Sequence, residues 1–224
     1  MELRFCYNKY NNRYISNGGE KMAPKAKYTK EEIAEIALGI VAGHGIEALN
    51  ARSLAEAMGT STRPIFTAYK NMDELEHSVR RLAMEQFARY TVIEDNGVPA
   101  FKQVGVHMLA FAKEQPKLFR LLFMSERVHS LSFRQVFDTI LGPSADKCIE
   151  YIMRDYGLSK EYAMELFRKV WIFTYGIGIL ISSNICRFTE QELSDMLTSE
   201  FKSALMMIKS RAEEQGAEPA DLPR

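Results

Sequence analysis

The sequence contains few cysteines, and their placement argues against two kinds of site. Cys6, Cys148 and Cys186 are odd in number and lie far apart in the 224 residues. Neither a disulfide framework nor a set of zinc ligands follows from such spacing. The four histidines form no HExxH or other paired arrangement. The sequence therefore predicts no metal site and no cofactor.

A net charge is also missing, because 29 Lys and Arg residues balance 29 Asp and Glu residues. A zero sum argues at first against a nucleic-acid partner, but the distribution of charge matters more than its total. Between Met22 and Lys30 three lysines occur without an acid. Such a basic arm can reach phosphates or a minor groove, and the alternative is a solvated, disordered tail.

No stretch alternates as a strand does, and apolar residues recur at helical spacing from residue 22 onward. The predicted fold class is therefore all-α, with about nine helices. A three-helix helix-turn-helix head is expected over residues 22–71, and a helical bundle for ligand binding and dimerisation over residues 72–212. Residues 1–21 are predicted to be a disordered leader or, if Met22 is the true start, not native protein. Residues 213–224 are predicted to be a disordered tail.

Capping residues and prolines predict where the helices begin. Thr29 and Glu32 form a capping box before a helix at 30–44, and Asn71 caps a long helix that ends near residue 93. This long helix would join the head to the body. Pro99 and Pro116 are expected to start two more helices, followed by helices at 132–141, 144–156, 160–186 and 190–212.

The stretch from Leu49 to Leu75, LNARSLAEAMGTSTRPIFTAYKNMDEL, predicts two short helices around a tight turn. Gly59 tolerates positive φ, and Thr60 or Ser61 can cap the second helix. Pro64 falls in the first turn of that helix, where a missing amide proton costs little. Inward positions are predicted for Ile65, Phe66 and Tyr69, and outward positions for Thr62, Arg63, Thr67 and Lys70.

This segment resembles the DNA-binding domain of TetR/AcrR transcriptional regulators. The resemblance covers roughly residues 28–79 and includes the capped first helix, Gly45-Ile46 and the run LAEAMGTSTRPIFTAYKNMDEL. In that family an aromatic pair three residues apart closes the recognition helix, and Phe66 and Tyr69 stand at those positions. A departure lies between them, because Thr67-Ala68 replaces a histidine-rich dipeptide that is common in the family.

The resemblance implies a ligand-responsive regulator, acting as a homodimeric repressor that a small molecule releases from its operator. A two-fold dimer would read a palindromic operator in double-stranded DNA, since one recognition helix covers only a few base pairs. Tyr69 is expected to pack its ring inward and reach a backbone oxygen with its hydroxyl. The predicted DNA-binding residues are Lys27, Arg52, Ser61, Thr62, Arg63, Pro64, Thr67, Tyr69 and Lys70.

The stretch from Val170 to Cys186 carries no charged residue, but we do not predict a membrane span. It is short for a bilayer crossing and contains several polar residues. A helix that is apolar all round is instead expected to lie between its own domain and a partner subunit, where Gly176 and Gly178 allow close approach. In the proteins that the chain resembles, helices equivalent to 160–186 and 190–212 form a four-helix dimer interface.

A small hydrophobic or aromatic ligand is expected in the body, as the resemblance implies. His107 and Tyr175 are predicted to supply hydrogen bonds, and each could equally be satisfied by a neighbouring backbone group. Aromatic residues at helical spacing are also common in plain cores. The predicted pocket residues are His107, Phe111, Phe123, Phe137, Trp171 and Tyr175.

Two other functions stay open at this point. A helical-bundle enzyme would need a nucleophile with a base, or a carboxylate cluster at metal-ligand spacing, and we find neither, so no enzymatic activity is predicted. An adaptor would keep the head but use it for protein contacts. Because no signal sequence is recognisable, a cytoplasmic location is predicted.

Overall fold

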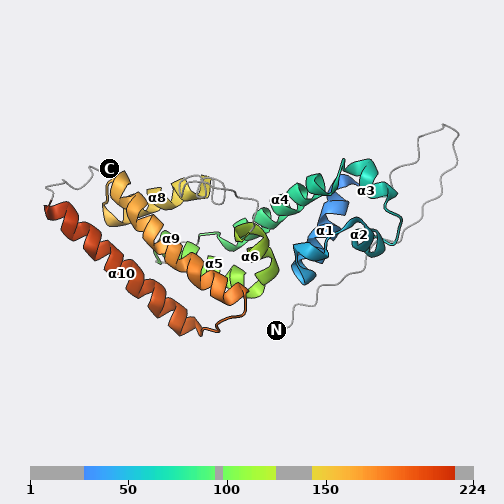
Figure 1. The fold of residues 1–224 in the computed structure, drawn as a ribbon. Helices are drawn as coiled ribbons and strands as arrows, with labels where there is room; N and C mark the ends of the chain where they lie inside the picture. Colours follow the sequence, from blue (N-terminus) through green and yellow to red (C-terminus); the bar gives the residue numbers. More distant parts are fainter. Residues whose placement is uncertain (1–27, 94–97, 125–142, 215–224) are drawn as a thin grey trace.

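The computed structural model describes residues 28–93, 98–124 and 143–214. Within these ranges every regular element is a helix, which confirms the predicted all-α class. Helices α1 (Lys30–His44), α2 (Ala51–Ala57) and α3 (Arg63–Ala68) lie together at one end of the molecule, with the short 3-10 helix η1 (Ile46–Ala48) after α1 (Figure 1). The leader at 1–21, the helix expected at 132–141 and residues 215–224 lie outside the described ranges.

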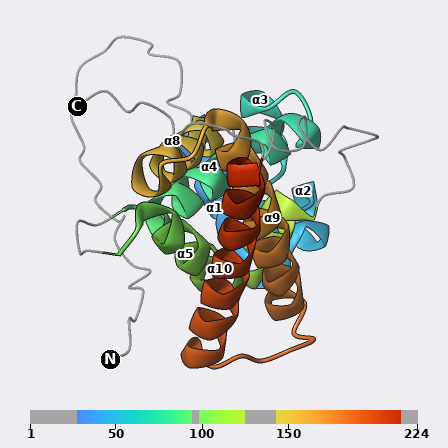
Figure 2. The same cartoon turned by 90° about the vertical axis from the view of Figure 1, so that its left-hand side faces the viewer.

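Helix α4 (Met72–Tyr90) leads from this end into the body of the molecule (Figure 1). There it packs against α5 (Ala100–Glu114) and α6 (Pro116–Phe123). The body is completed by α8 (Pro143–Tyr156), α9 (Lys160–Ser182) and α10 (Glu190–Glu214). Helix α9 is central, because α5, α6, α8 and α10 all pack against it. Helix α10 lies along the outer edge in Figure 1 and faces the viewer, in front of α9, in Figure 2.

Several helices begin at the caps that the sequence predicts. Thr29 and Glu32 exchange both hydrogen bonds of the capping box before α1. Side chains of Asn71, Ser159 and Thr189 accept backbone N–H groups in the first turns of α4, α9 and α10. Each such cap stabilises its helix by about 1 kcal/mol. Local hydrogen bonding thus sets where these helices start.

The predicted helix ends are less accurate. Helix α4 ends at Tyr90, three residues before the expected end at 93. Helix α9 ends at Ser182 and not at residue 186, because Asn184 adopts a φ of 54° and the chain turns back. The backbone N–H of Ile185 then donates to the carbonyl of Leu180. Helix α10 extends to Glu214, which is two residues beyond the expected end.

The two predicted domains share one continuous buried core. Ile33 and Leu54 belong to the same cluster of buried side chains as Phe111 and Phe119. This continuity exists because α1 packs against both α4 and α6. A second cluster, which includes Ile152 of α8, holds α8, α9 and α10 together. Among the described residues, no helix combines the length and hydropathy that crossing a membrane requires.

The glycines of α9 differ in what surrounds them. A Cβ atom at Gly178 would lie 2.6 Å from Cζ of Phe119, so this glycine makes room for a ring of α6 in the same chain. A Cβ atom at Gly176 would meet nothing within 4 Å. The expectation that both glycines admit a neighbouring backbone is therefore wrong at Gly178, where a side chain of the same chain fills the space.

Candidate functional site

The turn between α2 and α3 forms around Gly59, as predicted. Gly59 has a φ of 62°, and its N–H donates to the carbonyl of Glu56, while Thr60 N–H donates to the carbonyl of Ala55. These backbone bonds extend the turn, so α3 begins after Thr62, whose side chain makes no capping bond. The predicted hydroxyl cap from Thr60 or Ser61 is therefore wrong. Pro64 does lie in the first turn of α3.

The inner face of α3 consists of Ile65 and Tyr69. Both are buried, and the Tyr69 side chain is only 2% exposed. Its hydroxyl donates to the carbonyl of Lys30 at 2.7 Å, and the Lys30 ammonium lies 4.7 Å from the centre of its ring. Tyr69 thus packs its ring inward as predicted. Its predicted contact with DNA finds no support in this geometry, because both the ring and the hydroxyl are used within the head.

Phe66 is the second correction on this helix. It was expected to face inward, but half of its side chain, 50%, is exposed. Helix α3 has only six residues, and Ile65 and Tyr69, one turn apart, already occupy its inward stripe. Phe66 is rotated about 100° from Ile65 on the helix and therefore projects outward.

The outer surface around α3 is polar, and we call it the α3 face. Its predicted DNA-binding residues are all exposed: Arg52, Ser61, Thr62, Arg63, Thr67 and Lys70. Pro64 is half-buried at its edge, and Lys27 lies outside the described residues. No acid occurs between Glu56 and Asp73. With Phe66 added, the α3 face combines cations and hydroxyls, which suit phosphates and base edges, with an apolar group that suits a thymine methyl.

An ion pair fixes the C-terminal end of α3 against its neighbours. The Lys30 ammonium lies 2.5 Å from a carboxylate oxygen of Glu74, and the backbone N–H of Lys70 donates to the other oxygen. The hydrogen bonds from Lys30 and Lys70 lower the pKa of the Glu74 carboxyl below its ordinary value. Glu74 therefore stays ionised at neutral pH and ties α1 to the segment between α3 and α4.

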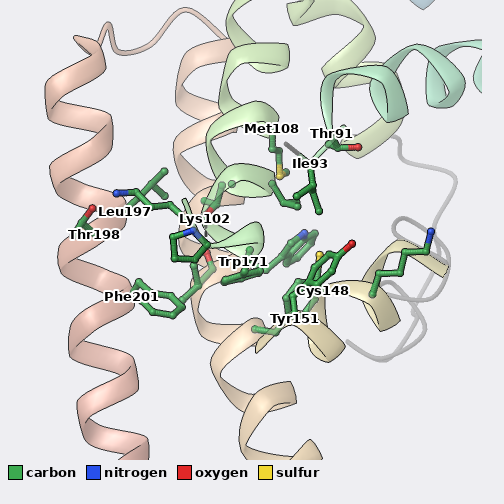
Figure 3. Close-up of a pocket in the computed structure, with 18 of the residues that line it drawn as sticks. Thr91, Ile93, Lys102, Met108, Cys148, Tyr151, Trp171, Leu197, Thr198 and Phe201 are labelled. Carbon is green, nitrogen blue, oxygen red and sulfur yellow. Dashed lines mark hydrogen bonds between the residues drawn. The ribbon is translucent and has the colours of Figure 1, made fainter. Parts of the chain in front are cut away.

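The body contains a cavity of about 750 Å³ between α4, α5, α8, α9 and α10 (Figure 3). This volume lies within the range of about 300–1,000 Å³ that is usual for small-molecule sites. Most of its wall is apolar. The aromatic lining residues are Phe87, Phe101, Tyr151, Tyr156, Phe167, Trp171 and Phe201.

The polar lining of the cavity consists of lysines, hydroxyls and one thiol. Lys102, Lys147 and Lys202 come from three different helices. Burial raises the pKa of the Cys148 thiol to about 12, so this thiol stays protonated at neutral pH. Burial and the nearby Asp155 charge also raise the pKa of the Tyr156 phenol. Both groups can therefore act as neutral donors toward a ligand.

Of the predicted pocket residues that the structure describes, Trp171 alone lines this cavity. Phe111 and Phe123 are instead core residues, and each ring packs edge-on against Phe87 at a centroid distance of 5.2 Å. Phe87 presents its other side to the cavity. Phe111 and Phe123 therefore lie one layer of packing behind the wall of this cavity.

Tyr175 and His107 are also outside the lining. Tyr175 stacks on Trp171 at 5.0 Å, and its hydroxyl donates to the carbonyl of Phe123. The hydroxyl is therefore satisfied by backbone, which is the alternative that the sequence left open. His107 does not line the cavity, and its buried Nδ1 atom has no hydrogen-bond partner among the described residues. Phe137 lies outside the described residues.

The comparisons with known proteins give little beyond this geometry. No family model matches the chain, and no curated protein is significantly similar to it in sequence. Among solved structures, a TetR variant from Acinetobacter baumannii AYE in complex with minocycline is 17% identical, with a TM-score of 0.42. The match covers 88% of this chain and 99% of that chain. A likeness at this level indicates no function for the chain.

Proposed function

We propose that this chain is a cytoplasmic, ligand-responsive regulator of transcription, and that it acts as a homodimeric repressor released from its operator by a small molecule. The observation that carries the proposal is the α3 face, which presents exposed cations and hydroxyls and includes a stretch, residues 57–72, that contains no acid. The resemblance of residues 28–79 to TetR/AcrR regulators supports the same assignment. No catalytic step is part of this function.

Arg63 and Thr67 lie one turn apart on α3, and the Thr67 hydroxyl donates to the carbonyl of Arg63 at 2.9 Å. The Arg63 guanidinium is exposed, and its five N–H donors can bind a guanine edge in a major groove. Lys70 and Arg52 flank the helix and suit phosphate contacts. Together these residues provide base contacts from α3 and phosphate contacts from its borders.

Dimerisation is supported by apolar side chains on the outer helices. Ile172 of α9 is 51% exposed and Met206 of α10 is 72% exposed, and Met164 and Met207 are exposed on the same two helices. Large apolar groups in contact with water favour association. Gly176 is open as well, so a second copy can approach α9 there. A dimer would bring two α3 faces to one operator.

Helix α4 is suited to link ligand and DNA binding, as its length suggested. Its first turn is bonded through Glu74 to Lys30 and Lys70 beside α3. Near its other end, Phe87 and Thr91 line the cavity. Suppose that α4 can take two orientations, which give the two heads of a dimer different spacings. A ligand that binds one orientation more tightly would then shift the dimer toward the corresponding spacing.

A second connection runs from the cavity through α6. Trp171 lines the cavity and stacks on Tyr175, whose hydroxyl holds the carbonyl of Phe123 at the end of α6. The Arg80 guanidinium of α4 donates to the Leu121 carbonyl on the same turn. Because α6 packs on α1, a shift of Trp171 can reach the head without passing along α4.

The test is selection of bound fragments from genomic DNA by the full chain, followed by affinity measurements on the selected fragments. We expect fragments that share two inverted half-sites and bind with strong salt dependence. Arg63→Ala should lose discrimination between selected and random fragments. The matched control is Lys113→Ala, an exposed cation of α5 in the body, which should bind as the wild type does.

Two results would contradict the proposal. Recovery of random genomic fragments by the wild type would show that α3 reads no sequence. Equal discrimination by wild type and Arg63→Ala would place the specific contacts elsewhere. A chain that dimerises but shifts no DNA would favour the adaptor function instead.

A further inference from the structure

The charges on the cavity wall all have one sign. In the described part of the chain, every charged residue that lines the cavity is a lysine, namely Lys102, Lys147 or Lys202, and no Asp or Glu takes part. No ion pair with a described carboxylate involves any of the three. Their positive charge is therefore not neutralised by described acids at the wall. A ligand in this cavity would meet a positive potential.

Two of the three lysines lie on helices that pack against each other. Lys202 lies one turn after Thr198 on α10, so both side chains share a face of that helix. Lys102 is on α5, which packs against α10. The first turn of α5 also supplies Phe101 to the wall, so the positive end of its dipole lies at the cavity. Figure 3 shows Lys102, Thr198 and Phe201 on the side of the cavity that faces α10.

Apart from the three lysines, the polar side chains of the wall are uncharged and supply both acceptors and donors. Thr174 and Thr91 donate their hydroxyl protons to carbonyls of their own helices, which leaves oxygen lone pairs toward the ligand. The Cys148 thiol is protonated, and Tyr151 presents a phenol. Aromatic walls can also hold cations, but an ammonium ligand would need a carboxylate partner to offset three lysines. No described acid at the wall supplies one.

We propose that the cavity binds an apolar organic anion, with its hydrocarbon or aromatic body against the aromatic wall and its anionic group at the edge formed by Lys102, Thr198 and Lys202. This inference rests on the proposed function, because it names the class of ligand that would release the regulator from DNA. The side chains of Lys102 and Lys202 are both exposed. The anionic group therefore sits at the mouth of the cavity and keeps part of its hydration.

The fluorescence of the only tryptophan in the sequence can be used to follow ligand binding. Trp171 is the single tryptophan of the 224 residues, and it lines the cavity. Energy transfer from Trp171 therefore reports a bound probe, and the cavity-filling variant below shows whether that probe is in the cavity. Two fluorescent probes share the same naphthalene and phenyl rings: anilinonaphthalene sulfonate is an anion, and phenylnaphthylamine lacks the sulfonate and is neutral. Their affinities for the full chain are measured by titration at low salt.

We expect both probes to quench Trp171. Replacing both lysines in Lys102→Gln/Lys202→Gln should weaken the sulfonate by about tenfold, since each exposed charge pair contributes a modest amount. The neutral probe should change by less than about twofold, which also shows that the variant is folded. The matched control is Lys113→Gln/Lys209→Gln, which removes one exposed lysine from each of the same two helices away from the cavity and should alter neither probe.

A cavity-filling variant tests separately whether the cavity is a ligand site and whether that site prefers an anion. A Cβ atom at Gly105 would lie 3.9 Å from Thr174 Oγ1 and 4.0 Å from Leu197 Cδ1, which is ordinary van der Waals contact, and Gly105 lines the cavity, so Gly105→Val should reduce the space for a ligand. It should weaken both probes. If it weakens both but the lysine double variant affects them equally or not at all, the anion inference is overturned and the ligand site stands. If Gly105→Val changes the affinity of neither probe, or if neither probe binds, the anion inference and the ligand site are both overturned.

Discussion

The α3 face and the body cavity place aromatic side chains in opposite settings. On the α3 face, Phe66 and Arg63 project into water from one short helix, and Tyr69 beneath them is buried. In the body, Trp171 is buried at the wall of a cavity to which five helices contribute, and the exposed Lys102 lines the same cavity. A surface of this kind suits a large polar partner such as DNA, and a largely apolar cavity suits a small molecule. The difference separates the two proposed binding functions within one chain.

The largest expected effect comes from truncating the buried aromatic side chain at the end of α3, Tyr69, in comparison with the exposed one, Phe66. Tyr69→Ala should lower the free energy of unfolding by about 4 kcal/mol, because it removes a buried ring and leaves the Lys30 carbonyl without its hydroxyl donor. Phe66→Ala should change stability by less than about 1 kcal/mol, because the ring is half-exposed. Urea unfolding followed by circular dichroism measures both. Equal costs would contradict the inner and outer assignment.

The second comparison uses the two glycines of α9. Gly178→Ala should destabilise the chain by about 1–3 kcal/mol, because the added methyl group would lie 2.6 Å from the buried ring of Phe119. Gly176→Ala meets open space and should be neutral or stabilise α9 by up to about 1 kcal/mol. If Gly176→Ala instead weakens self-association in analytical ultracentrifugation, the open side of α9 is where the second copy binds.

On the α3 face, the cations should separate by role. Arg63→Ala should reduce discrimination between the selected and mutated fragments by about 1–3 kcal/mol, as expected for loss of a base contact. Lys70→Ala should weaken all fragments alike and reduce the salt slope by about one, as expected for loss of a phosphate contact. Fluorescence anisotropy at several salt concentrations distinguishes them. Identical behaviour of the two variants would mean that α3 supplies phosphate contacts only.

The smallest effect concerns the Glu74 ion pair and its dependence on pH. The hydrogen bond from Lys30, followed by that from the Lys70 N–H, lowers the pKa of Glu74 from its ordinary value of 4.5. Its stabilising contribution is therefore present above pH 4.5 and is lost as the pH falls through the lowered folded-state pKa. Lys30→Gln should make the loss of stability below pH 4.5 shallower, while Lys113→Gln leaves it unchanged. Urea midpoints at pH 6 and pH 3.5 measure the difference, and parallel curves for wild type and Lys30→Gln would show that the pair contributes nothing.

The head could be predicted from the sequence because its structure depends on short-range signals. The Thr29 and Asn71 caps and the Gly59 turn each act within a few residues, and all three occur as predicted. The error at Phe66 arose because a six-residue helix buries only a narrow stripe. Helical periodicity alone does not give the width of that stripe.

The cavity could not be predicted in the same way. Its wall combines residues from Phe87 to Leu205, and neighbours on one helix can lie on different sides of the wall. Phe123 and Phe111 have the same residue type and helical setting as Phe101, yet Phe101 lines the cavity and the other two fill the core. The three lining lysines gave no local signal, because each by itself resembles an ordinary solvated side chain.

The central claim is that the cavity and the α3 face are thermodynamically linked. The direct measurement is the affinity of the full chain for a selected DNA fragment, with and without a compound chosen because it quenches Trp171. We predict that saturating compound weakens DNA binding, and that saturating DNA weakens binding of the compound by the same factor, since linkage is reciprocal. An unchanged DNA affinity while Trp171 is fully quenched would contradict the account.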